Sequence, residues 1–352
     1  MFLDKNIKKS ELAWEKILQS KNVLLISHLN PDVDALSSLS VLIEILKDLN
    51  KNYIAFADGK KEDEYSFLPN EEEIIGDKKN LLKIISHRFN SGKEVGDDFF
   101  KFFDLAIIVD CGSMSRTSLK DNIVNVRDLM LDTVIIEFDH HVPVDNYADI
   151  EIRIPLSSTT EVLYNFIKIN NIKINRSMAN CLLAGILTDT GNLLYPSVSS
   201  DTLDISSELM SLGAQFPKLL DNTWRNKSFI EMKLWGLALA NLKINKKYNL
   251  AFSVLPWKDL ENFKTDFGEW GSEIFGDIVG FISNLSEADM VLLIREDETG
   301  KIKGSLRVGF SEKDIDCTKL ASIFGGGGHK KASGFMIEGH IKKIDGNNFK
   351  II

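Results

Sequence analysis

Cysteine is scarce in this sequence: only Cys111, Cys181 and Cys317 are present, and they are far apart. Their odd number and the lack of a CxxC pair argue against a disulfide framework and against a cysteine zinc site. So few isolated cysteines are typical of a reducing compartment, so we expect a cytoplasmic location. The lysines near the first residue are followed by no apolar segment, and no signal peptide is expected.

Long apolar runs and excess positive charge are also lacking. No stretch approaches the roughly 18 consecutive apolar residues of a membrane-spanning helix, so we expect no membrane partner. Lys and Arg total 42 against 51 Asp and Glu, which gives a formal net charge of -9. Long duplex nucleic acids need many Lys and Arg contacts with phosphate, and this acidic balance argues against them. It leaves room for a local basic pocket that binds a short charged substrate.

What is present indicates two globular domains. The 352 residues exceed what one hydrophobic core usually holds, and a hydrophobic content of 44% is enough for two cores. The sequence changes character after a mostly helical segment. We therefore place the first domain at 1–205, a helical connector at 206–245 and the second domain at 246–352.

The first domain alternates apolar strands with amphipathic helices. Strands are predicted over 23–27, 53–57, 105–109 and 134–138, and helices over 35–49, 158–170, 175–188 and 201–212. This alternation is typical of an α/β fold, with a mostly parallel sheet flanked by helices. The less regular segment 58–103, with one helix over 79–87, is interpreted as surface elaboration.

The second domain is predicted to be a smaller, mixed α/β domain. A strand over 250–255 precedes a hairpin formed by 290–295 and 302–310, whose turn contains Gly300. A short helix over 316–324 ends at a run of glycines, and a last strand begins at 335–337.

Aspartates and histidines gather where the predicted elements of the first domain end. The clusters are His28 with Asp32 and Asp34, then Asp110, then Asp139-His140-His141, and finally Asp189 after a helix. Ligands of open α/β sheets bind beyond the carboxyl ends of the strands, so one site could collect all these clusters. Carboxylates and imidazoles without thiolates suit Mn²⁺ or Mg²⁺, and four ligating aspartates would balance two divalent cations.

Each of these residues also has a structural interpretation. A single aspartate at a strand end is commonly a helix cap or a turn residue, and His28 alone could be a buried structural histidine. The clusters taken together are not explained in this way, because each falls at the ligand-binding end of the predicted sheet.

A glycine run in the second domain predicts an anion-binding segment. Gly325, Gly326, Gly327 and Gly328 precede His329 and two lysines. Glycines allow close approach of the backbone to an anion, and their N–H groups can bind phosphate oxygens. Arg307 on a nearby strand could add a bidentate phosphate contact. The alternatives are a flexible loop for the glycines and a surface charge for Arg307.

These motifs resemble the DHH phosphoesterase superfamily, whose name derives from the element seen here as Asp139-His140-His141. The segments SLRV and FGGGGHKKASGF resemble its associated substrate-binding domain, DHHA1. The resemblance covers nearly the whole chain and is nearest to nanoRNases that are also 3'-phosphoadenosine-5'-phosphate phosphatases, together with cyclic di-AMP phosphodiesterases. It implies an active-site cleft between the two domains.

The resemblance also implies roles for individual residues. His28 and Asp32 would hold a first manganese, Asp34, His140 and Asp189 a second, and Asp110 would bridge both. Asp139 would orient a histidine, and His141 would lie near the reacting phosphate. Arg307, the four glycines and His329 would bind the substrate. Cys111, Gly112 and Val33 depart from the usual motifs without removing a ligand, and so could alter the shape of the pocket.

The expected activity is manganese-dependent hydrolysis of short nucleotides to 5'-mononucleotides, with magnesium as the alternative metal. Linear dinucleotides such as pApA, nanoRNA, cyclic di-AMP and 3'-phosphoadenosine-5'-phosphate all stay open as substrates, as does a second copy of the chain as a partner. A non-catalytic nucleotide sensor is the alternative from another class. Such a sensor would be expected to have lost metal ligands, whereas every expected ligand is present.

Overall fold

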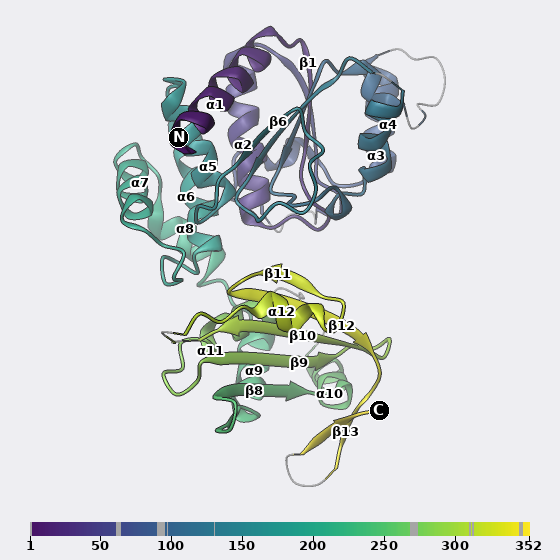
Figure 1. The fold of residues 1–352 in the computed structure, drawn as a ribbon, viewed down its shortest axis with the longest axis vertical. Helices are drawn as coiled ribbons and strands as arrows, with labels where there is room; N and C mark the ends of the chain where they lie inside the picture. Colours follow the sequence, from purple (N-terminus) through teal and green to yellow (C-terminus); the bar gives the residue numbers. More distant parts are fainter. Residues whose placement is uncertain are drawn as a thin grey trace. The chain divides into compact units, whose positions relative to one another are not determined.

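The computed structural model describes residues 2–60, 65–89, 96, 98–129, 131–267, 274–309, 311, 313–344 and 348–352. The chain divides into two compact units, Met1–Arg225 and Asn226–Ile352. This division falls inside 206–245, the segment that the sequence predicts as a helical connector. Each unit contains a sheet of its own (Figure 1).

The first unit contains a parallel sheet in the strand order β3-β2-β1-β4-β5-β6. Its strands are β1 (Asn22–Ile26), β2 (Asn52–Phe56), β3 (Ile74–Ile75), β4 (Leu105–Val109), β5 (Val134–Asp139) and β6 (Ile150–Arg153). All neighbouring strands pair in parallel. The predicted α/β class, with a mostly parallel sheet, is therefore confirmed, although β3 and β6 were not predicted.

Helices cover both faces of this sheet (Figure 1). One group comprises α1 (Phe2–Gln19), α2 (Val33–Asp48), α5 (Thr159–Ile169) and α6 (Arg176–Asp189), and the other comprises α3 (Lys78–Arg88) and α4 (Lys120–Asp128). Along β1, Val23 and Leu25 join the core of the first group, whereas Leu24 and Ile26 join the core of the second. Burial on both faces explains the unbroken apolar sequence of the central strands.

Two further helices, α7 (Ser200–Ser211) and α8 (Phe216–Thr223), pack against α6. Short 3₁₀ helices span η1 (Glu71–Glu73), η2 (Phe99–Phe102) and η3 (Met114–Arg116). The helices α1 and α4 were not predicted from the sequence.

The interpretation of 58–103 as surface elaboration is wrong for much of its described part. Phe99 and Phe100 are fully buried, as are Leu81 and Ile85 of α3. These side chains fill the core beneath β1, β2 and β4. Leu81 and Ile85 have the spacing of the predicted helix, whereas adjacent Phe99 and Phe100 fit neither a helical nor a strand period, so the sequence pattern does not identify the two phenylalanines as core. Residues 61–64, 90–95 and 97 of this segment lie outside the described residues.

The second unit contains a mixed sheet in the order β11-β12-β10-β9-β8-β7. Its strands are β7 (Lys243–Asn245), β8 (Leu250–Leu255), β9 (Met290–Glu296), β10 (Lys301–Val308), β11 (Gly327–His329) and β12 (Ala332–Glu338). Only β8 and β9 pair in parallel among these neighbours of the described chain. The predicted mixed α/β domain is thus confirmed.

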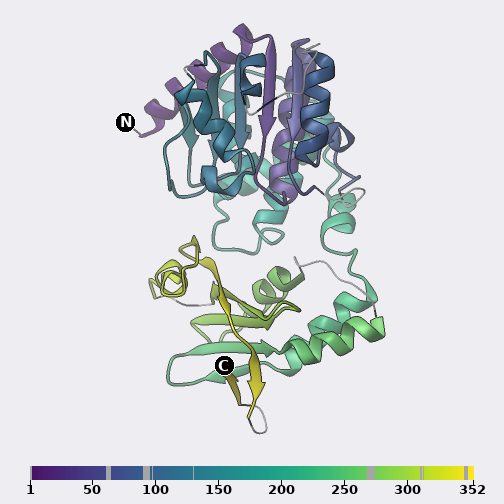
Figure 2. The same cartoon turned by 90° about the vertical axis from the view of Figure 1, so that its right-hand side faces the viewer.

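Helices of the second unit are α9 (Phe229–Ala240), α10 (Trp257–Phe267), α11 (Ile274–Ile282) and α12 (Cys317–Ser322). The first three contribute to one core with β8 and β9, and α12 packs against β10, β11 and β12. A hairpin of β13 (Ile341–Lys343) and β14 (Phe349–Ile351) projects from the sheet in both Figure 1 and Figure 2. Within the described part of the whole chain, no helix combines the length and hydrophobicity needed to span a membrane.

The predicted hairpin of the second unit corresponds to β9 and β10, and Phe310 at its expected end lies outside the described residues. The helices α10 and α11 were not predicted. The glycine run divides into two parts: Gly325 turns the chain with a φ of 71°, whereas Gly327 and Gly328 begin β11. β11 pairs with β12, so these glycines are part of the sheet edge.

A buried charge network lies on β5 and β6 of the first unit. Arg153 donates from Nε to Glu137, and the hydroxyl of Tyr147 donates to the same carboxylate. The side chains of Arg153 and Glu137 are 6% and 0% exposed. Burial raises the pKa of Glu137 to about 7, although the hydrogen bonds from Arg153 and Tyr147 oppose this shift. Arg153 is therefore the partner that makes a buried carboxylate tolerable.

Replacing Arg153 with methionine is expected to lower the free energy of unfolding by about 3–5 kcal/mol at pH 8, because the carboxylate is left buried without a cationic partner. Arg153 lowers the pKa of Glu137, so its loss makes the folded state bind the Glu137 proton more tightly, and the variant loses more stability than the wild type as pH rises from the ordinary glutamate pKa. Denaturant titrations should therefore find a smaller deficit at pH 5. The double variant with Glu137→Gln should recover part of the loss, and equal deficits at both pH values would contradict this account.

Candidate metal centre

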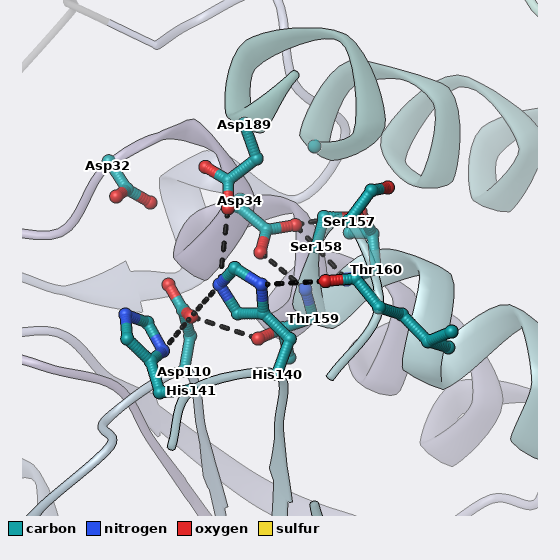
Figure 3. Close-up of polar contacts among 12 residues, drawn as sticks. Asp32, Asp34, Asp110, His140, His141, Ser157, Ser158, Thr159, Thr160 and Asp189 are labelled. Atoms are coloured by element: carbon teal, nitrogen blue, oxygen red, sulfur yellow. Dashed lines mark hydrogen bonds and ion pairs between the residues drawn. The ribbon is translucent and has the colours of Figure 1, made fainter. Parts of the chain in front are cut away.

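The acidic and histidine clusters of the first unit meet at one edge of its sheet (Figure 3). Asp110 follows β4 directly, and Asp139 is the last residue of β5. His28 lies two residues beyond β1, and Asp189 is the last residue of α6. The carboxyl ends of parallel strands share one edge, which explains why motifs distant in sequence are neighbours here.

The potential metal ligands form overlapping groups of three. The groups are His28 with Asp32 and Asp110, then Asp34 with His140 and Asp189, and then Asp110 with His140 and His141. In each group one ligand atom per residue lies within 4.8 Å of the others. These groups could hold a metal ion, and Asp110 connects the first group to the histidines of the others.

Asp110 occupies the centre of this arrangement. Its carboxylate oxygens lie 3.6 Å from His28 Nε2, 3.5 Å from His140 Nε2 and 3.4 Å from His141 Nδ1. Its backbone has a φ of 57°, in the left-handed region that non-glycine residues seldom adopt. Backbone strain of this kind persists where the surrounding structure enforces it, commonly at functional sites.

The orientations of His28 and His140 test whether the site fits a cation. His28 Nδ1 lies 3.0 Å from the carbonyl oxygen of Leu29, and His140 Nδ1 lies 3.4 Å from that of Leu156. Each Nδ1 therefore carries a proton when the ring is neutral, and each Nε2 presents a lone pair toward the carboxylates. Backbone carbonyls orient metal-ligating histidines in this way.

The Nε2 atom of His28 gives the clearest indication that the site fits a cation. It is buried and makes no hydrogen bond to the described residues, although Asp32 and Asp110 lie 3.8 Å and 3.6 Å away. Likewise, His140 Nε2 lies 3.2 Å from an Asp189 oxygen. A lone pair that faces carboxylate oxygens is unfavourable unless a proton or a metal cation lies between them. The donor set therefore fits hard or borderline divalent ions.

The pKa values of the site show the same lack of positive charge. Burial and the nearby Asp110 raise the pKa of Asp34 to about 7. Burial and Asp34 also raise the pKa of Asp189 above its usual range. Although burial lowers the pKa of His28, the nearby carboxylates of Asp110 and Asp32 raise it to about 10. Burial is the larger cause for the two aspartates, and neighbouring carboxylates contribute to all three shifts.

Sequence reasoning missed the residues that fix Asp34. Its carboxylate accepts hydrogen bonds from Thr159 N at 2.7 Å, Thr160 N at 3.0 Å and Thr160 Oγ1 at 2.7 Å. Thr159 Oγ1 also donates to Asp110 at 2.9 Å, so the first turn of α5 contacts both aspartates (Figure 3). The signal available in the sequence was the run of polar residues Ser157–Glu161 at the start of an apolar helix. In the structure all five of these residues are buried.

Asp139 contacts His141 and the backbone. It accepts hydrogen bonds from the backbone N–H groups of Gly112 and His141, and its Oδ1 lies 2.8 Å from His141 Nδ1. The opposite ring nitrogen, His141 Nε2, lies 3.1 Å from an Arg116 guanidinium nitrogen. Arg116, at the end of η3, is a further residue that the sequence interpretation missed, because a single arginine carries no motif.

The predicted substrate-binding residues lie in the second unit. Arg307 is on β10, where it pairs with Ala332 of β12, and His329 of β11 pairs with the same residue. The guanidinium of Arg307 donates to its neighbouring carbonyl, that of Leu306, at 3.1 Å. Their roles toward a substrate, and the cleft expected between the domains, stay predictions.

A parallel sheet that gathers carboxylates and imidazoles beyond its strands defines an α/β protein with a candidate centre for two metal ions. Two family models match the chain: the DHH family, N-terminal domain, over residues 22–186, and the DHHA1 domain over residues 260–347. Together the two ranges take up most of the chain. The chain therefore belongs to the DHH/DHHA1 phosphoesterase family, as its motifs indicate.

Similar proteins align with this chain over nearly its whole length. The bifunctional oligoribonuclease and PAP phosphatase NrnA of Bacillus subtilis (strain 168) is 27% identical over 321 residues, which cover 90% of this chain and 89% of the relative. Its counterpart in Thermus thermophilus is 25% identical over 336 residues, with coverage of 93% and 90%. The crystal structure of an exopolyphosphatase-related protein from Bacteroides fragilis has a TM-score of 0.77 and 24% identity, covering 93% of this chain and 90% of that one. This last likeness supports the fold.

Proposed function

We propose that this phosphoester hydrolase cleaves the phosphodiester bonds of short linear oligonucleotides and releases nucleoside 5'-monophosphates. In this proposal two divalent cations, manganese in preference to magnesium, are held by His28, Asp32, Asp34, Asp110, His140 and Asp189. The single observation that carries the proposal is the pair of ligand groups on either side of Asp110. Two neighbouring cation positions are the usual arrangement for displacement at phosphorus.

When bound, the cations would supply Lewis acidity toward the phosphoryl oxygens and activate water for attack. The chain's own contribution is to fix the ligands before the substrate arrives. Thr159 and Thr160 hold Asp34 and Asp110 through four hydrogen bonds, so the carboxylates need little reorganisation. The buried setting of Asp34 and Asp110 excludes water and strengthens electrostatic interactions at the centre.

We assign His141 to the reacting phosphate and Asp139 to the orientation of His141. Asp139 Oδ1 accepts from the protonated Nδ1 of His141, which leaves Nε2 as the nitrogen that accepts a proton or a hydrogen bond. Arg116 lies beside that nitrogen and brings a positive charge to the edge of the centre. His141 would exchange a proton with the substrate or with water, while Arg116 would offset charge on the phosphate.

The names of the relatives favour linear oligonucleotides, and they introduce a second candidate. The Bacillus subtilis relative is called both an oligoribonuclease and a PAP phosphatase. The second candidate is therefore release of the 3'-phosphate of 3'-phosphoadenosine-5'-phosphate at the same centre. Both reactions break an ester bond at phosphorus and would use the same ligands.

In the second unit, we assign the binding of the substrate's outer phosphates and bases to Arg307, Gly325, Gly326, Gly327, Gly328 and His329. The space around Gly325 and Gly327 is compatible with this assignment, because a Cβ at either position would meet nothing within 4 Å, whereas a Cβ at Gly326 would lie 2.2 Å from the carbonyl oxygen of Gly334. A side chain could not be accommodated at Gly326, so close approach of this backbone to its neighbours requires glycine.

A comparison of substrates tests the proposal. Initial rates would be measured for pApA, a 5'-phosphorylated trinucleotide, cyclic di-AMP and 3'-phosphoadenosine-5'-phosphate, each with Mn²⁺ and with Mg²⁺. We expect the linear substrates to react at least about tenfold faster than cyclic di-AMP, and to react faster with Mn²⁺. Turnover of 3'-phosphoadenosine-5'-phosphate alone would establish the second candidate instead. Nucleotide binding without turnover of any substrate would indicate a sensor and contradict both.

The compartment proposed for this activity is the cytoplasm. Cys111, Cys181 and Cys317 are free and buried, with no disulfide among them. Free cysteines are typical of a reducing environment, where short RNA products would also occur.

A further inference from the structure

Two positive side chains face each other across β9 and β10 of the second unit. Arg295 and Lys303 are paired directly in the antiparallel register, so their side chains project from the same face of the sheet. Like charges placed directly opposite each other destabilise a sheet. Among the residues that the structure describes, neither side chain takes part in an ion pair. This cost calls for an explanation.

Asp297 attracts Arg295, but burial still lowers the pKa of Arg295, so the positive charge is only partly offset. Asp297 follows β9, and its Oδ1 accepts hydrogen bonds from Thr299 N, Thr299 Oγ1 and Lys301 N in the turn before β10. Glu296 is adjacent to Arg295 in the strand and therefore projects from the opposite face, where it accepts from the backbone of Trp257 and Ile341.

Arg295 is held in place while one of its donors is unused. Its guanidinium lies over the ring of Phe275 in α11, with its central carbon 4.3 Å from the ring centroid. Its Nε is buried and makes no hydrogen bond to any described residue. Burial lowers the pKa of Arg295, and partial burial together with the charges of Arg295 and Arg307 lowers the pKa of Lys303. The position of Arg295 is thus fixed, Lys303 is exposed beside it, and the two positive charges are only partly balanced.

The same face of β10 leads from Lys303 to Arg307. Lys303, Ser305 and Arg307 alternate along the strand, which places them on one face roughly 13 Å apart from first to last. Between them, Ser305 pairs with Gly334 of β12, which has no side chain of its own. Met336, which pairs with Lys303, is 53% exposed and offers an apolar surface at the same end.

We propose that Arg295 and Lys303 form a second phosphate-binding subsite, which holds a phosphate of an oligonucleotide more than one nucleotide away from the phosphate contacted by Arg307. The inference rests on the proposed function, because it assigns the subsite to the substrate of that reaction. A phosphate would supply the missing negative charge, with Arg295 as a directional donor and Lys303 as a point charge. The subsite would favour substrates with several phosphates over those with one.

A substrate with a single phosphate provides the internal control. The dinucleoside monophosphate ApA has its one phosphate at the scissile position, so it cannot occupy the subsite at the same time. Lys303→Met is expected to lower kcat/KM for a 5'-phosphorylated trinucleotide about tenfold, in line with the loss of one charge-assisted hydrogen bond. The value for ApA should change less than about twofold. Lys303→Arg should restore trinucleotide cleavage.

Two further measurements separate a subsite from a structural role. Because Lys303→Met removes a like-charge contact, its melting temperature should equal or exceed that of the wild type. Lys343→Met removes the same charge from exposed Lys343 on β13 and should leave both substrates unaffected. Equal losses for ApA and the trinucleotide, or a trinucleotide rate unchanged by Lys303→Met, would overturn the subsite.

Binding in EDTA tests the subsite even if turnover fails. A fluorescently labelled, 5'-phosphorylated trinucleotide should bind the wild-type chain about tenfold more tightly than Lys303→Met, and added salt should reduce this difference. Equal affinities would refute the subsite. If the wild type binds with the expected difference but hydrolyses neither substrate with Mn²⁺, the proposed reaction fails while the subsite stands.

Discussion

Replacing Asp110 with asparagine is expected to lower kcat/KM about a thousandfold or more while leaving the fold intact. The Asp110 carboxylate lies within 3.6 Å of Nε2 atoms of His28 and His140. It therefore contributes charge to both ligand groups, and an amide of the same shape cannot replace that charge. Loss of several kcal/mol of electrostatic stabilisation corresponds to this range of rates.

Asparagine is a better replacement than alanine for this test. Asp110 has a φ of 57°, a left-handed conformation that asparagine adopts more readily than alanine. The amide oxygen can also keep the hydrogen bond from Thr159 Oγ1, which is 2.9 Å long in the structure. A loss of activity in Asp110→Asn can therefore be attributed to charge, whereas alanine would add backbone strain and an unpaired hydroxyl.

Melting temperatures provide a readout that is independent of activity. Asp34 and Asp189 have pKa values raised by burial and by neighbouring carboxylates, Asp110 among them. Removing the charge of Asp110 relieves this repulsion, so the metal-free variant should melt at or above the wild-type temperature. Manganese should then raise the melting temperature of the wild type by several degrees and that of the variant by much less.

A matched control lies at the opposite end of the same strand. Asp104 precedes β4 and accepts hydrogen bonds from Lys21 N at 2.8 Å and Asn22 N at 3.1 Å. Asp104→Asn makes the same change in charge and should keep its response to manganese and its kcat/KM within about twofold. Near-normal turnover of Asp110→Asn with manganese present would contradict the proposed centre.

The sequence predicts the ligand types of this centre well because strand order and chemistry constrain them together. His28 and Asp110 come after strands rich in apolar residues, and Asp139 ends a strand in which Glu137 is the other charged residue. Parallel strands end at a common edge of the sheet. Residue types at such positions are then sufficient to suggest a cation site. The structure adds the relation between the groups: Asp110 lies within reach of three histidines.

The supporting contacts could not be predicted in the same way. Thr159 and Thr160 reach Asp34 from a separate helix, at a separation of more than a hundred residues. A polar helix start reads as an ordinary capping sequence, since Ser158 does cap α5 through Glu161 N. Thr159 and Thr160 of the same polar segment also donate hydrogen bonds to Asp34. This second role depends on how α5 packs against α2, and local sequence patterns do not specify that packing.

The core residues of 58–103 were missed for a related reason. Phe99 and Phe100 lie in a 3₁₀ helix, where two adjacent aromatic residues are both buried. Neither a helical nor a strand period places neighbouring residues on one buried face. In the second unit, Arg295 and Lys303 are cross-strand neighbours only because of the register of β9 and β10. The sequence of the turn between these strands does not determine that register.

Replacing Gly185 with alanine is expected to cause the second large loss of activity, because α6 packs closely against the candidate metal centre at this residue. A Cβ at Gly185 would lie 2.3 Å from Asp34 Oδ1 and 2.4 Å from Thr160 Oγ1, well inside normal contact distances. Asp34 cannot move aside without losing its hydrogen bonds from Thr159 and Thr160. The variant should therefore displace a proposed metal ligand, and a displacement of about 1 Å can reduce kcat/KM roughly a hundredfold.

The sign of the stability change makes Gly185→Ala diagnostic. In a helix open to solvent, alanine in place of glycine stabilises the protein by about 0.5–1 kcal/mol. Gly236 in α9 provides that case, because a Cβ there would meet nothing within 4 Å. We expect Gly236→Ala to raise the free energy of unfolding and Gly185→Ala to lower it by about 1–3 kcal/mol, as measured by denaturant titration. If Gly185→Ala were as stable and as active as Gly236→Ala, then α6 would not hold Asp34 in place. The reaction would then not require tight packing around the group formed by Asp34, His140 and Asp189.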